Sequence, residues 1–261
     1  MAASSMTLAR PDLSTRVALS KSALVGFDLC STKAGFELTQ RLPMLPSEKV
    51  SFGSALDGAI EHVIVGARDG TPALDTMTRV AEAIEAVEVK DGMDLPTDEL
   101  MRAVNGFRAE VLPNHDWSGV ATQPDLWAEI PGLGQVNGHP DVVMADNRIW
   151  DVKSSSREKP MPSLELGLYA VLLERAHEVI VPEVGYLTWV RSGRGRWVTQ
   201  RMTVDAELRR WVWENARRYA MAREKDAFYG GPKFPGLCTD CQYNPANGGP
   251  CAIAFRGGPE E

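Results

Sequence analysis

The chain has 261 residues, of which 44% are hydrophobic and 24% charged, and its formal net charge is −7 at pH 7. No apolar stretch is long enough to span a bilayer, and residues 1–5 lead into no signal-like segment, which excludes a membrane-spanning or secreted class. We therefore expect a soluble, intracellular protein with ample material for a core, folded as a single domain over residues 1–261.

The first half of the chain is predicted to be mainly helical. Helical patterning predicts short helices over residues 20–30 and 53–66. Two alanine-rich stretches of mixed charge, 72–88 and 97–111, predict two more helices whose apolar positions recur at helical spacing. We therefore expect a helical subdomain over residues 67–115.

Two short apolar runs around residues 145–148 predict a β-hairpin. Side chains two apart on a strand share a face, so Asp151 and Lys153 point the same way. Asp141 joins them only if it lies opposite Asp151 or Lys153. That pairing requires an odd-length loop, such as three residues ending at a left-handed Asn147, or a bulge; a regular two-residue turn would separate the carboxylates.

Two carboxylates and a lysine at this spacing suit metal-dependent phosphodiester hydrolysis. Asp141 and Asp151 are hard oxygen ligands for Mg²⁺ or Mn²⁺, which orient a phosphate and activate a water. Lys153 would lie beside that water, where its ammonium lowers the water's pKa or hydrogen-bonds the developing oxyanion. The competing interpretation is an ordinary exposed hairpin, because Asp-x-Lys is common by chance.

The second half of the chain predicts a mixed sheet flanked by helices, with a core region over residues 116–204. Strands over 123–130 and 135–143 precede the Asp151 strand, and a helix capped by Ser163 follows it. A second hairpin then leads into a long helix through Trp211, Trp213 and Tyr219. These elements favour the α/β class.

Positive charge is concentrated in residues 190–225, where ten Arg or Lys residues stand against four acidic ones, a local balance of +6. Arg191, Arg194 and Arg196, at the glycine-rich tip of the second hairpin, are the candidate contacts to phosphates. Two tryptophans of the same hairpin, Trp189 and Trp197, either stack on bases or face the core. We favour the core.

Three of the four cysteines lie near the end of the chain as Cys238-x2-Cys241-x9-Cys251, and Cys30 lies far upstream. A disulfide framework is a poor explanation, because the chain is large and has no secretory signal. Four thiolates can hold either a structural Zn²⁺ or a [4Fe-4S] cluster, and the ligand set does not separate the two. Either centre would clamp Cys30 to residues 230–255 and couple metal binding to folding.

Four segments together fit one family pattern. In chain order they are Leu19-Ser20-Lys21-Ser22 with Phe27 and Cys30, like an S-x-S helix ending in cysteine; Phe52-Gly53 to Asp57, like G-x-x-x-H; Pro140-Asp141 with Asp151-Val152-Lys153; and Glu165 to Tyr169, like Q-x-x-x-Y. This set resembles the PD-(D/E)xK nuclease superfamily, in the form of RecB-like and CRISPR-associated iron–sulfur exonucleases, including phage-type members.

The resemblance implies a restriction-endonuclease-like mixed sheet flanked by helices, with a C-terminal iron–sulfur clamp. It favours a [4Fe-4S] cluster at the four cysteines, although the x9 gap is longer than is usual in the family and keeps zinc open. It also implies catalytic roles for Glu165 and Tyr169, and Asp57 as a further metal ligand. Asp57 stands where the family has His and Glu165 where it has Gln, so a solvated carboxylate is the alternative for each.

The function implied by the resemblance is a metal-dependent, ATP-independent DNA exonuclease. It would prefer single strands or ends, act 5′→3′, serve recombination or DNA end processing, and be cytoplasmic, whether or not it is phage-encoded in a bacterial host. The sequence has no G-x-x-x-x-G-K-(S/T) loop, so any helicase or recombination partner would be a separate chain. Two alternatives stay open: a catalytically weak or inactive DNA-binding relative, and a zinc-stabilised interaction module.

Overall fold

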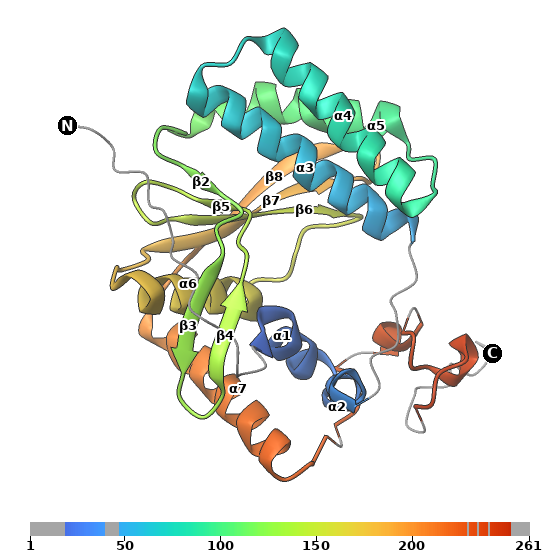
Figure 1. The fold of residues 1–261 in the computed structure, drawn as a ribbon, viewed down its shortest axis with the longest axis vertical. Helices are drawn as coiled ribbons and strands as arrows, with labels where there is room; N and C mark the ends of the chain where they lie inside the picture. Colours follow the sequence, from blue (N-terminus) through green and yellow to red (C-terminus); the bar gives the residue numbers. More distant parts are fainter. Residues whose placement is uncertain (1–18, 40–46, 229, 234, 240, 252–261) are drawn as a thin grey trace.

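The computed structural model describes residues 19–39, 47–228, 230–233, 235–239 and 241–251 (Figure 1). Its helices are α1 (Lys21–Leu29), α2 (Ser31–Thr39), α3 (Glu48–Asp69), α4 (Ala73–Asp91), α5 (Thr97–Gly106), α6 (Leu164–His177) and α7 (Ala206–Glu224). Its strands are β1 (Leu19–Ser20), β2 (Ala121–Thr122), β3 (Leu126–Ile130), β4 (Gly134–Gly138), β5 (Val142–Val143), β6 (Ile149–Ser155), β7 (Glu183–Val190) and β8 (Arg196–Thr203). No described helix is long and apolar enough to cross a membrane.

The strands form two mixed sheets. The five-stranded sheet has the order β2-β5-β6-β7-β8, in which β6 and β7 run parallel and the other neighbours antiparallel. The three-stranded sheet has the order β1-β4-β3, with β1 parallel to β4. The crossover between the parallel strands β6 and β7 is made by α6, as parallel pairing requires. The predicted α/β class is therefore confirmed.

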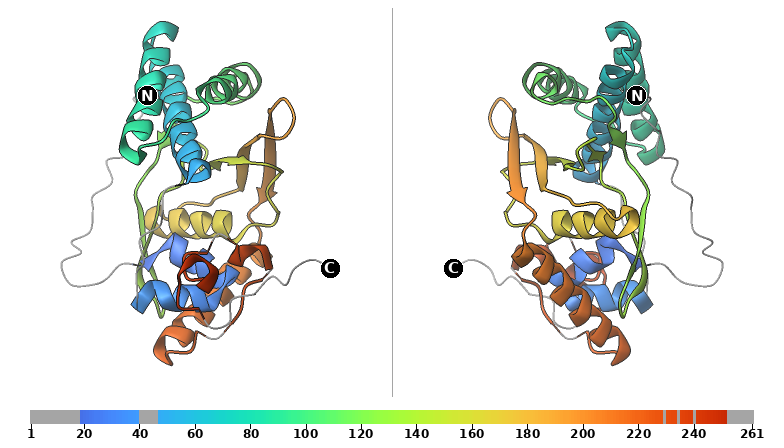
Figure 2. Two further views of the ribbon diagram at one scale, coloured as in Figure 1. Left: turned by 90° about the vertical axis from the view of Figure 1, so that its right-hand side faces the viewer. Right: turned by 90° about the vertical axis from the view of Figure 1, so that its left-hand side faces the viewer.

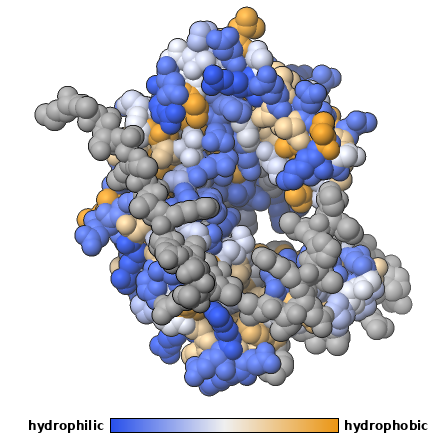
Figure 3. All heavy atoms as spheres, in the orientation of Figure 1, coloured by the Kyte–Doolittle hydropathy of each residue, from blue (hydrophilic) through white to orange (hydrophobic). Residues whose placement is uncertain are grey.

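The five-stranded sheet lies between two layers of helices (Figures 1 and 2). Side chains alternate along β6: Trp150 and Val152 join the apolar cluster of α3, α4 and α5, whereas Ile149 joins the cluster of α6 and α7. Asp151 therefore lies on the α6 side, at a strand position that would otherwise be apolar. In Figure 3 hydrophilic side chains cover much of the face between the two layers, and the surface is hollowed below α3.

Side-chain caps fix where the helices around the sheet begin. The hydroxyl of Ser47 accepts a hydrogen bond from Val50 N at the start of α3, and the carboxylate of Asp205 accepts one from Leu208 N at the start of α7. The predicted cap of α6 is confirmed, because Ser163 Oγ accepts from Leu166 N at 3.4 Å. Each cap satisfies an amide that has no partner within its helix.

Two stretches differ from the sequence-based expectation. Residues 135–143 were expected to form one strand, but β4 ends at Gly138 and β5 begins at Val142, in different sheets. Pro140 has no amide hydrogen to donate, so it does not continue a ladder of hydrogen bonds. The second difference is α2, which the sequence analysis did not predict.

The second predicted hairpin is present as β7 and β8, with residues 191–195 at its tip. Trp189 and Trp197 are only 3% and 8% exposed, and both belong to the cluster formed with α3, α4 and α5. Trp197 Nε1 also donates to Ala103 O at 2.7 Å. The core interpretation of both tryptophans is confirmed, and neither is placed to stack on a base.

Candidate active site

The hairpin of β5 and β6 has the register that the sequence analysis required. Val142 pairs with Trp150, and Met144 N donates to Arg148 O at 2.8 Å, which leaves a three-residue loop, 145–147. Asn147 closes that loop with a φ of 66°. The same register puts Asp141 opposite Asp151, and Asp141 Oδ2 accepts from the next amide, Val152 N, at 2.6 Å.

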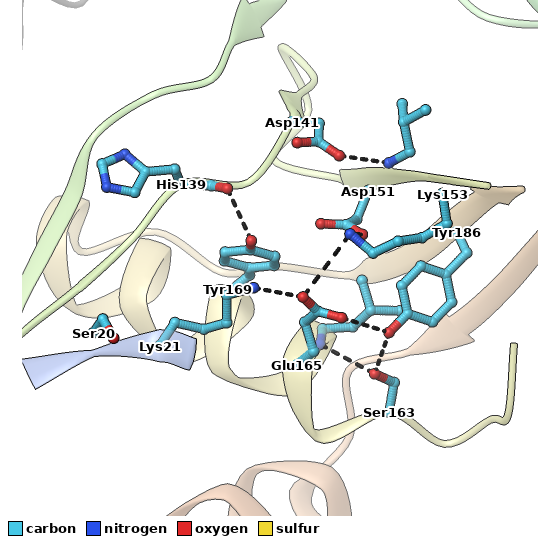
Figure 4. A network of polar contacts seen from close by, with 12 residues as sticks. Ser20, Lys21, His139, Asp141, Asp151, Lys153, Ser163, Glu165, Tyr169 and Tyr186 are labelled. Carbon is cyan, nitrogen blue, oxygen red and sulfur yellow. Dashed lines mark hydrogen bonds and ion pairs between the residues drawn. The ribbon is translucent and has the colours of Figure 1, made fainter. Parts of the chain in front are cut away.

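Five of the predicted site residues meet beside β6, and Figure 4 shows four of them, Asp141, Asp151, Lys153 and Glu165. We call all five the carboxylate site: Asp57, Asp141, Asp151, Lys153 and Glu165. The Lys153 ammonium contacts Asp151 Oδ2 and lies 3.9 Å from Glu165 Oε1. Asp57, from α3, faces the charges of Lys153, Asp151 and Glu165. Three elements far apart in the sequence therefore contribute to one charged cluster.

Burial and the neighbouring lysine charges together set the pKa of each carboxyl group in the site. Burial raises the pKa of Asp57 and of Asp151 to about 7 and that of Asp141 to about 6, although the Lys153 charge opposes each shift. Burial also acts to raise the pKa of Glu165, but Lys153 and Lys21 outweigh it and hold that pKa below its ordinary value. The site therefore carries surplus negative charge that tends to take up protons.

The opposite balance applies to Lys153. Burial acts to lower the pKa of its ammonium, but the carboxylates of Asp151, Glu165 and Asp141 outweigh burial and raise that pKa well above its ordinary value. Lys153 is therefore a permanent cation in the site. It suits stabilisation of negative charge and does not suit a role as a general base.

Tyr169, the last predicted catalytic residue, borders the site from α6. Its hydroxyl donates to His139 O at 2.8 Å, in the segment that crosses between the two sheets. Burial and then the charges of Asp151 and Glu165 raise the pKa of the phenol, so the hydroxyl keeps its proton. Through this hydrogen bond Tyr169 holds in place the segment that leads from His139 to Asp141.

The residues present fit a hard divalent cation. Asp151 is 1% exposed, and its buried Oδ1 has no hydrogen-bond donor, which is the environment of an oxygen that needs a cation. Together with Asp57 and Asp141 it supplies the oxygen ligands that Mg²⁺ and Mn²⁺ prefer. As the described side chains are placed, no three His, Cys, Asp or Glu groups are arranged to hold an ion. At Asp151 the position next to the carboxylate is taken by the Lys153 ammonium.

The raised pKa values predict how the stability of the metal-free protein depends on pH. The folded pKa of Asp57 and Asp151 is about 7, whereas the unfolded chain has the ordinary value of 3.8. Between these values the folded state binds more protons, so the free energy of unfolding falls as pH rises from about 4 to about 7. Urea unfolding in EDTA at several pH values measures this slope, and Asp151→Asn should make it shallower. A free energy that rises with pH would contradict the burial of these carboxyls.

Two polar side chains that hold Glu165, those of Lys21 and Tyr186, were not predicted from the sequence. Lys21 Nζ lies 2.5 Å from Glu165 Oε1, and the Tyr186 hydroxyl donates to Glu165 Oε2 at 3.2 Å. Tyr186 in turn lies 2.6 Å from Ser163 Oγ, the α6 cap. Tyr186 lies opposite Asp151 in the parallel pair β6–β7, so only the strand pairing could have indicated it. Lys21 stands within the quoted S-x-S segment, but no spacing rule links it to α6.

The three arginines predicted to contact DNA have different surroundings. Arg191 stacks over Phe52 at 4.0 Å and donates twice to Glu99, both at 2.9 Å. Arg196 pairs with Glu158 at 2.9 Å. Arg194 is exposed at the hairpin tip. Arg191 thus joins β7 to α5, and Arg194 is the arginine of this group best placed to meet a phosphate.

All four cysteines line one cavity of about 70 Å³, which we call the cysteine cavity. None of them is in a disulfide. Burial raises the pKa of the Cys30 thiol, a backbone hydrogen bond opposes the shift, and the other three cysteines raise the pKa further. Mutual repulsion of thiolates disfavours their ionisation unless a cation is present. Cysteines are the donor type that a thiolate-bound metal needs, but among the described residues no three His, Cys, Asp or Glu side chains are placed to hold an ion as they stand.

Hydrogen bonds bring Cys30 to the C-terminal segment. Thr32 N donates to Gly230 O at 3.1 Å, Lys233 N donates to Leu29 O at 2.9 Å, and Cys30 forms an isolated bridge with Pro232. The proposed clamp segment runs to residue 255, and its part beyond 251 lies outside the described residues. Within the described part, backbone hydrogen bonds therefore join residues 29–32 to residues 230–233.

The long gap before the last cysteine folds back on itself. A short 3₁₀ turn, η4 (Pro245–Asn247), is followed by Gly248 in the left-handed region, and Cys251 N donates to Tyr243 O at 2.8 Å. A Cβ on Gly249 would lie 2.2 Å from the backbone of Tyr243, so only glycine fits there. The extra residues of the gap are therefore taken up by a compact turn that returns Cys251 to the cavity.

Comparison with known proteins supports the fold. No family model and no curated protein matches the sequence. The chain is similar to the crystal structure of a "Putative exonuclease" from Eubacterium rectale, with a TM-score of 0.56 and 12% identity over 87% of this chain and 88% of that one. The structure of SSO0001 gives a TM-score of 0.46 and 13% identity over 93% and 91%, from which no common fold is concluded. The first likeness shows a shared α/β fold.

Proposed function

We propose that this protein is a metal-dependent deoxyribonuclease that hydrolyses DNA phosphodiester bonds without ATP. The observation that carries the proposal is the register that sets Asp141 opposite Asp151, with Lys153 on the same face and Asp57 and Glu165 beside them. The shared fold with a protein described as an exonuclease supports the same class. The α/β fold alone would not, because many functions share one fold.

In this proposal each side chain has a distinct role. Asp57, Asp141 and Asp151 would hold Mg²⁺ or Mn²⁺, and the bound ion supplies an activated water and stabilises charge on the phosphate. Lys153 remains charged and stabilises the developing negative charge. Glu165 stays ionised and orients Lys153 from the α6 side, while Tyr169 holds the segment that carries Asp141.

We extend the proposal to the cysteine cavity, which would hold a [4Fe-4S] cluster. The four cysteines line one cavity together with residues of α1 and of the C-terminal segment, and four cysteine thiolates are the ligand set of both a [4Fe-4S] cluster and a structural zinc. Zinc remains the outcome that metal analysis would have to exclude.

The substrate is proposed to be DNA with a single-stranded end, degraded 5′→3′ in recombination or end processing. The assay uses purified protein with single- and double-stranded DNA labelled at either end, with Mg²⁺, Mn²⁺ or EDTA. We expect short products from the 5′ end of single strands with either metal and no cleavage in EDTA. Products from 3′ ends would reverse the polarity.

The same assay separates the alternatives. A protein that binds the labelled DNA but never cuts it would be a non-catalytic DNA-binding relative. A protein that neither binds nor cuts DNA, and contains one zinc, would be an interaction module. Cleavage that continues unchanged in EDTA would contradict a metal-dependent reaction.

A lysine beside the site is expected to hold the DNA strand. Gln200 clasps the backbone of Lys159, accepting from its N at 3.0 Å and donating to its O at 2.8 Å. Burial lowers the pKa of Lys159, the charges of Lys153 and Lys49 lower it further, and those of Glu165 and Asp151 oppose the shift. Its ammonium therefore lies near the carboxylate site.

We expect Lys159→Ala to weaken DNA binding equally for different sequences. The slope of log affinity against log salt should become shallower by about one, as for the loss of one phosphate contact. Fluorescence anisotropy in EDTA measures binding without cleavage. Lys90→Ala, on the exposed face of α4, is the matched control and should leave the slope unchanged. An unchanged slope for Lys159→Ala would show that Lys159 does not contact a DNA phosphate.

A further inference from the structure

Lys21 is a partly buried lysine next to the carboxylate site. Its side chain is 14% exposed, its ammonium lies 2.5 Å from Glu165 Oε1, and it lies 4.7 Å from the centre of the Tyr169 ring. Figure 4 shows it approaching Glu165 from the side opposite Lys153. Two lysines therefore converge on one carboxylate oxygen, since Lys153 Nζ lies 3.9 Å from the same atom.

The fold fixes the place of Lys21 with local interactions. The strand β1 pairs with β4, Ser20 caps α1 by accepting from Ala23 N at 3.2 Å, and Lys21 is the first residue of that helix. A Cβ on Gly138 would lie 3.4 Å from Lys21 Cβ and closer still to Leu172 and Tyr169. The glycine lets α1 and α6 approach β4 at the point where Lys21 reaches Glu165.

We propose that Lys21 is a positioning residue, an inference that rests on the proposed nuclease function. Its ammonium neutralises Glu165 and so leaves Lys153 beside Asp151, where the reaction needs a cation. Four carboxylates meet here, those of Asp57, Asp141, Asp151 and Glu165. Lys153 contacts Asp151 and lies 3.9 Å from Glu165 Oε1, so it is shared unequally between these two carboxylates.

Without Lys21, Glu165 would attract Lys153 away from Asp151, because unlike charges a few ångströms apart interact strongly in a partly buried site. The site would also carry one more net negative charge, which repels incoming phosphates. Both effects depend on the charge of Glu165, so they should disappear when Glu165 is neutral. This dependence distinguishes positioning from a packing role of the lysine side chain.

The test is a double-mutant cycle with Lys21→Met, Glu165→Gln and the double variant. We expect Lys21→Met to lower kcat by about tenfold or more, with a smaller change in KM. The double variant should match Glu165→Gln, so that removing the carboxylate rescues the loss of the lysine. Lys90→Met, on the exposed face of α4, is the control and should retain full activity.

Binding of Mn²⁺ in the absence of DNA gives a readout that needs no cleavage. Lys21→Met adds one net negative charge, so calorimetry should show Mn²⁺ binding tightened by about tenfold, with the double variant returning toward wild type. Should Lys21→Met fail to fold, Lys21→Gln replaces it.

Two results would overturn the inference about Lys21: a loss of activity from Lys21→Met that is equally large in the Glu165→Gln background, or a Mn²⁺ affinity that Lys21→Met leaves unchanged. A wild-type protein that cleaves no DNA would instead defeat the proposed function. The Mn²⁺ comparison would then still decide whether Lys21 neutralises Glu165.

Discussion

Asp151→Asn and Lys153→Met should each reduce metal-dependent DNA cleavage by about a thousandfold, while the protein remains folded. Asn keeps the size of Asp151 but removes the buried charge that a divalent cation needs. Met keeps most of the length of Lys153 but removes the cation that is held among Asp151, Asp141 and Glu165. Initial rates on end-labelled single strands, with and without Mn²⁺, measure both effects.

Asp94→Asn is the matched control, because Asp94 is an exposed carboxylate in the loop between α4 and α5. It should cleave DNA at the wild-type rate. Circular dichroism and the thermal midpoint establish that each variant is folded. Wild-type rates in both Asp151→Asn and Lys153→Met would show that the hairpin is not the site of the reaction.

The strongest prediction from sequence concerned a loop, because its geometry allowed few alternatives. Asp141 could meet Asp151 only through an odd-length connection, and Asn is among the residues that most readily adopt a positive φ. Of the two arrangements that the site required, an odd-length loop or a bulge, the structure has the three-residue loop that ends at Asn147. Alternation then places Asp151 and Lys153 on one face without further information.

The interactions that hold Glu165 could not be predicted from the sequence, because they join residues that are far apart in the chain. Lys21 and Glu165 are 144 residues apart, and their contact depends on β1 joining β4 and on α1 packing against α6. A sequence shows periodicity within an element but gives little about which elements pack together. Burial of a polar residue is equally hard to predict from sequence. Asp151 is a charged residue, yet it is 1% exposed because both faces of the sheet are covered.

The break between strands at His139-Pro140-Asp141 was not predicted from the sequence, because it depends on how the two sheets are placed. The pattern over residues 135–143 predicted a single strand through Pro140, although proline cannot donate to a ladder, and it did not show that the chain changes sheets there. The structure uses this break to bring His139 O to the Tyr169 hydroxyl. One short segment therefore connects both sheets to α6 at the position of Asp141.

Substitution of Cys30 by Ser should lower the stability of the whole protein. The thiol lies at the end of α1 and lines the cavity with three C-terminal cysteines. A structural metal centre contributes on the order of 10 kcal/mol to folding in small domains. Here hydrogen bonds also join residues 29–32 to residues 230–233, so we expect a smaller loss of about 4 kcal/mol, or about 10 °C in the thermal midpoint.

Cys30→Ser should also reduce cleavage, because α1 carries Cys30 at one end and Lys21 at the other, about 14 Å apart along the helix axis. Differential scanning calorimetry of anaerobically purified protein, with iron, sulfide and zinc analysis, measures the first effect. Thr239→Ala is the control, since Thr239 is exposed between Cys238 and Cys241. Brown protein with iron and sulfide, both lost in Cys30→Ser, would support the cluster. Colourless protein with one zinc would show that the cavity holds zinc and not a cluster. An unchanged thermal midpoint in Cys30→Ser would show that the cavity does not stabilise the fold.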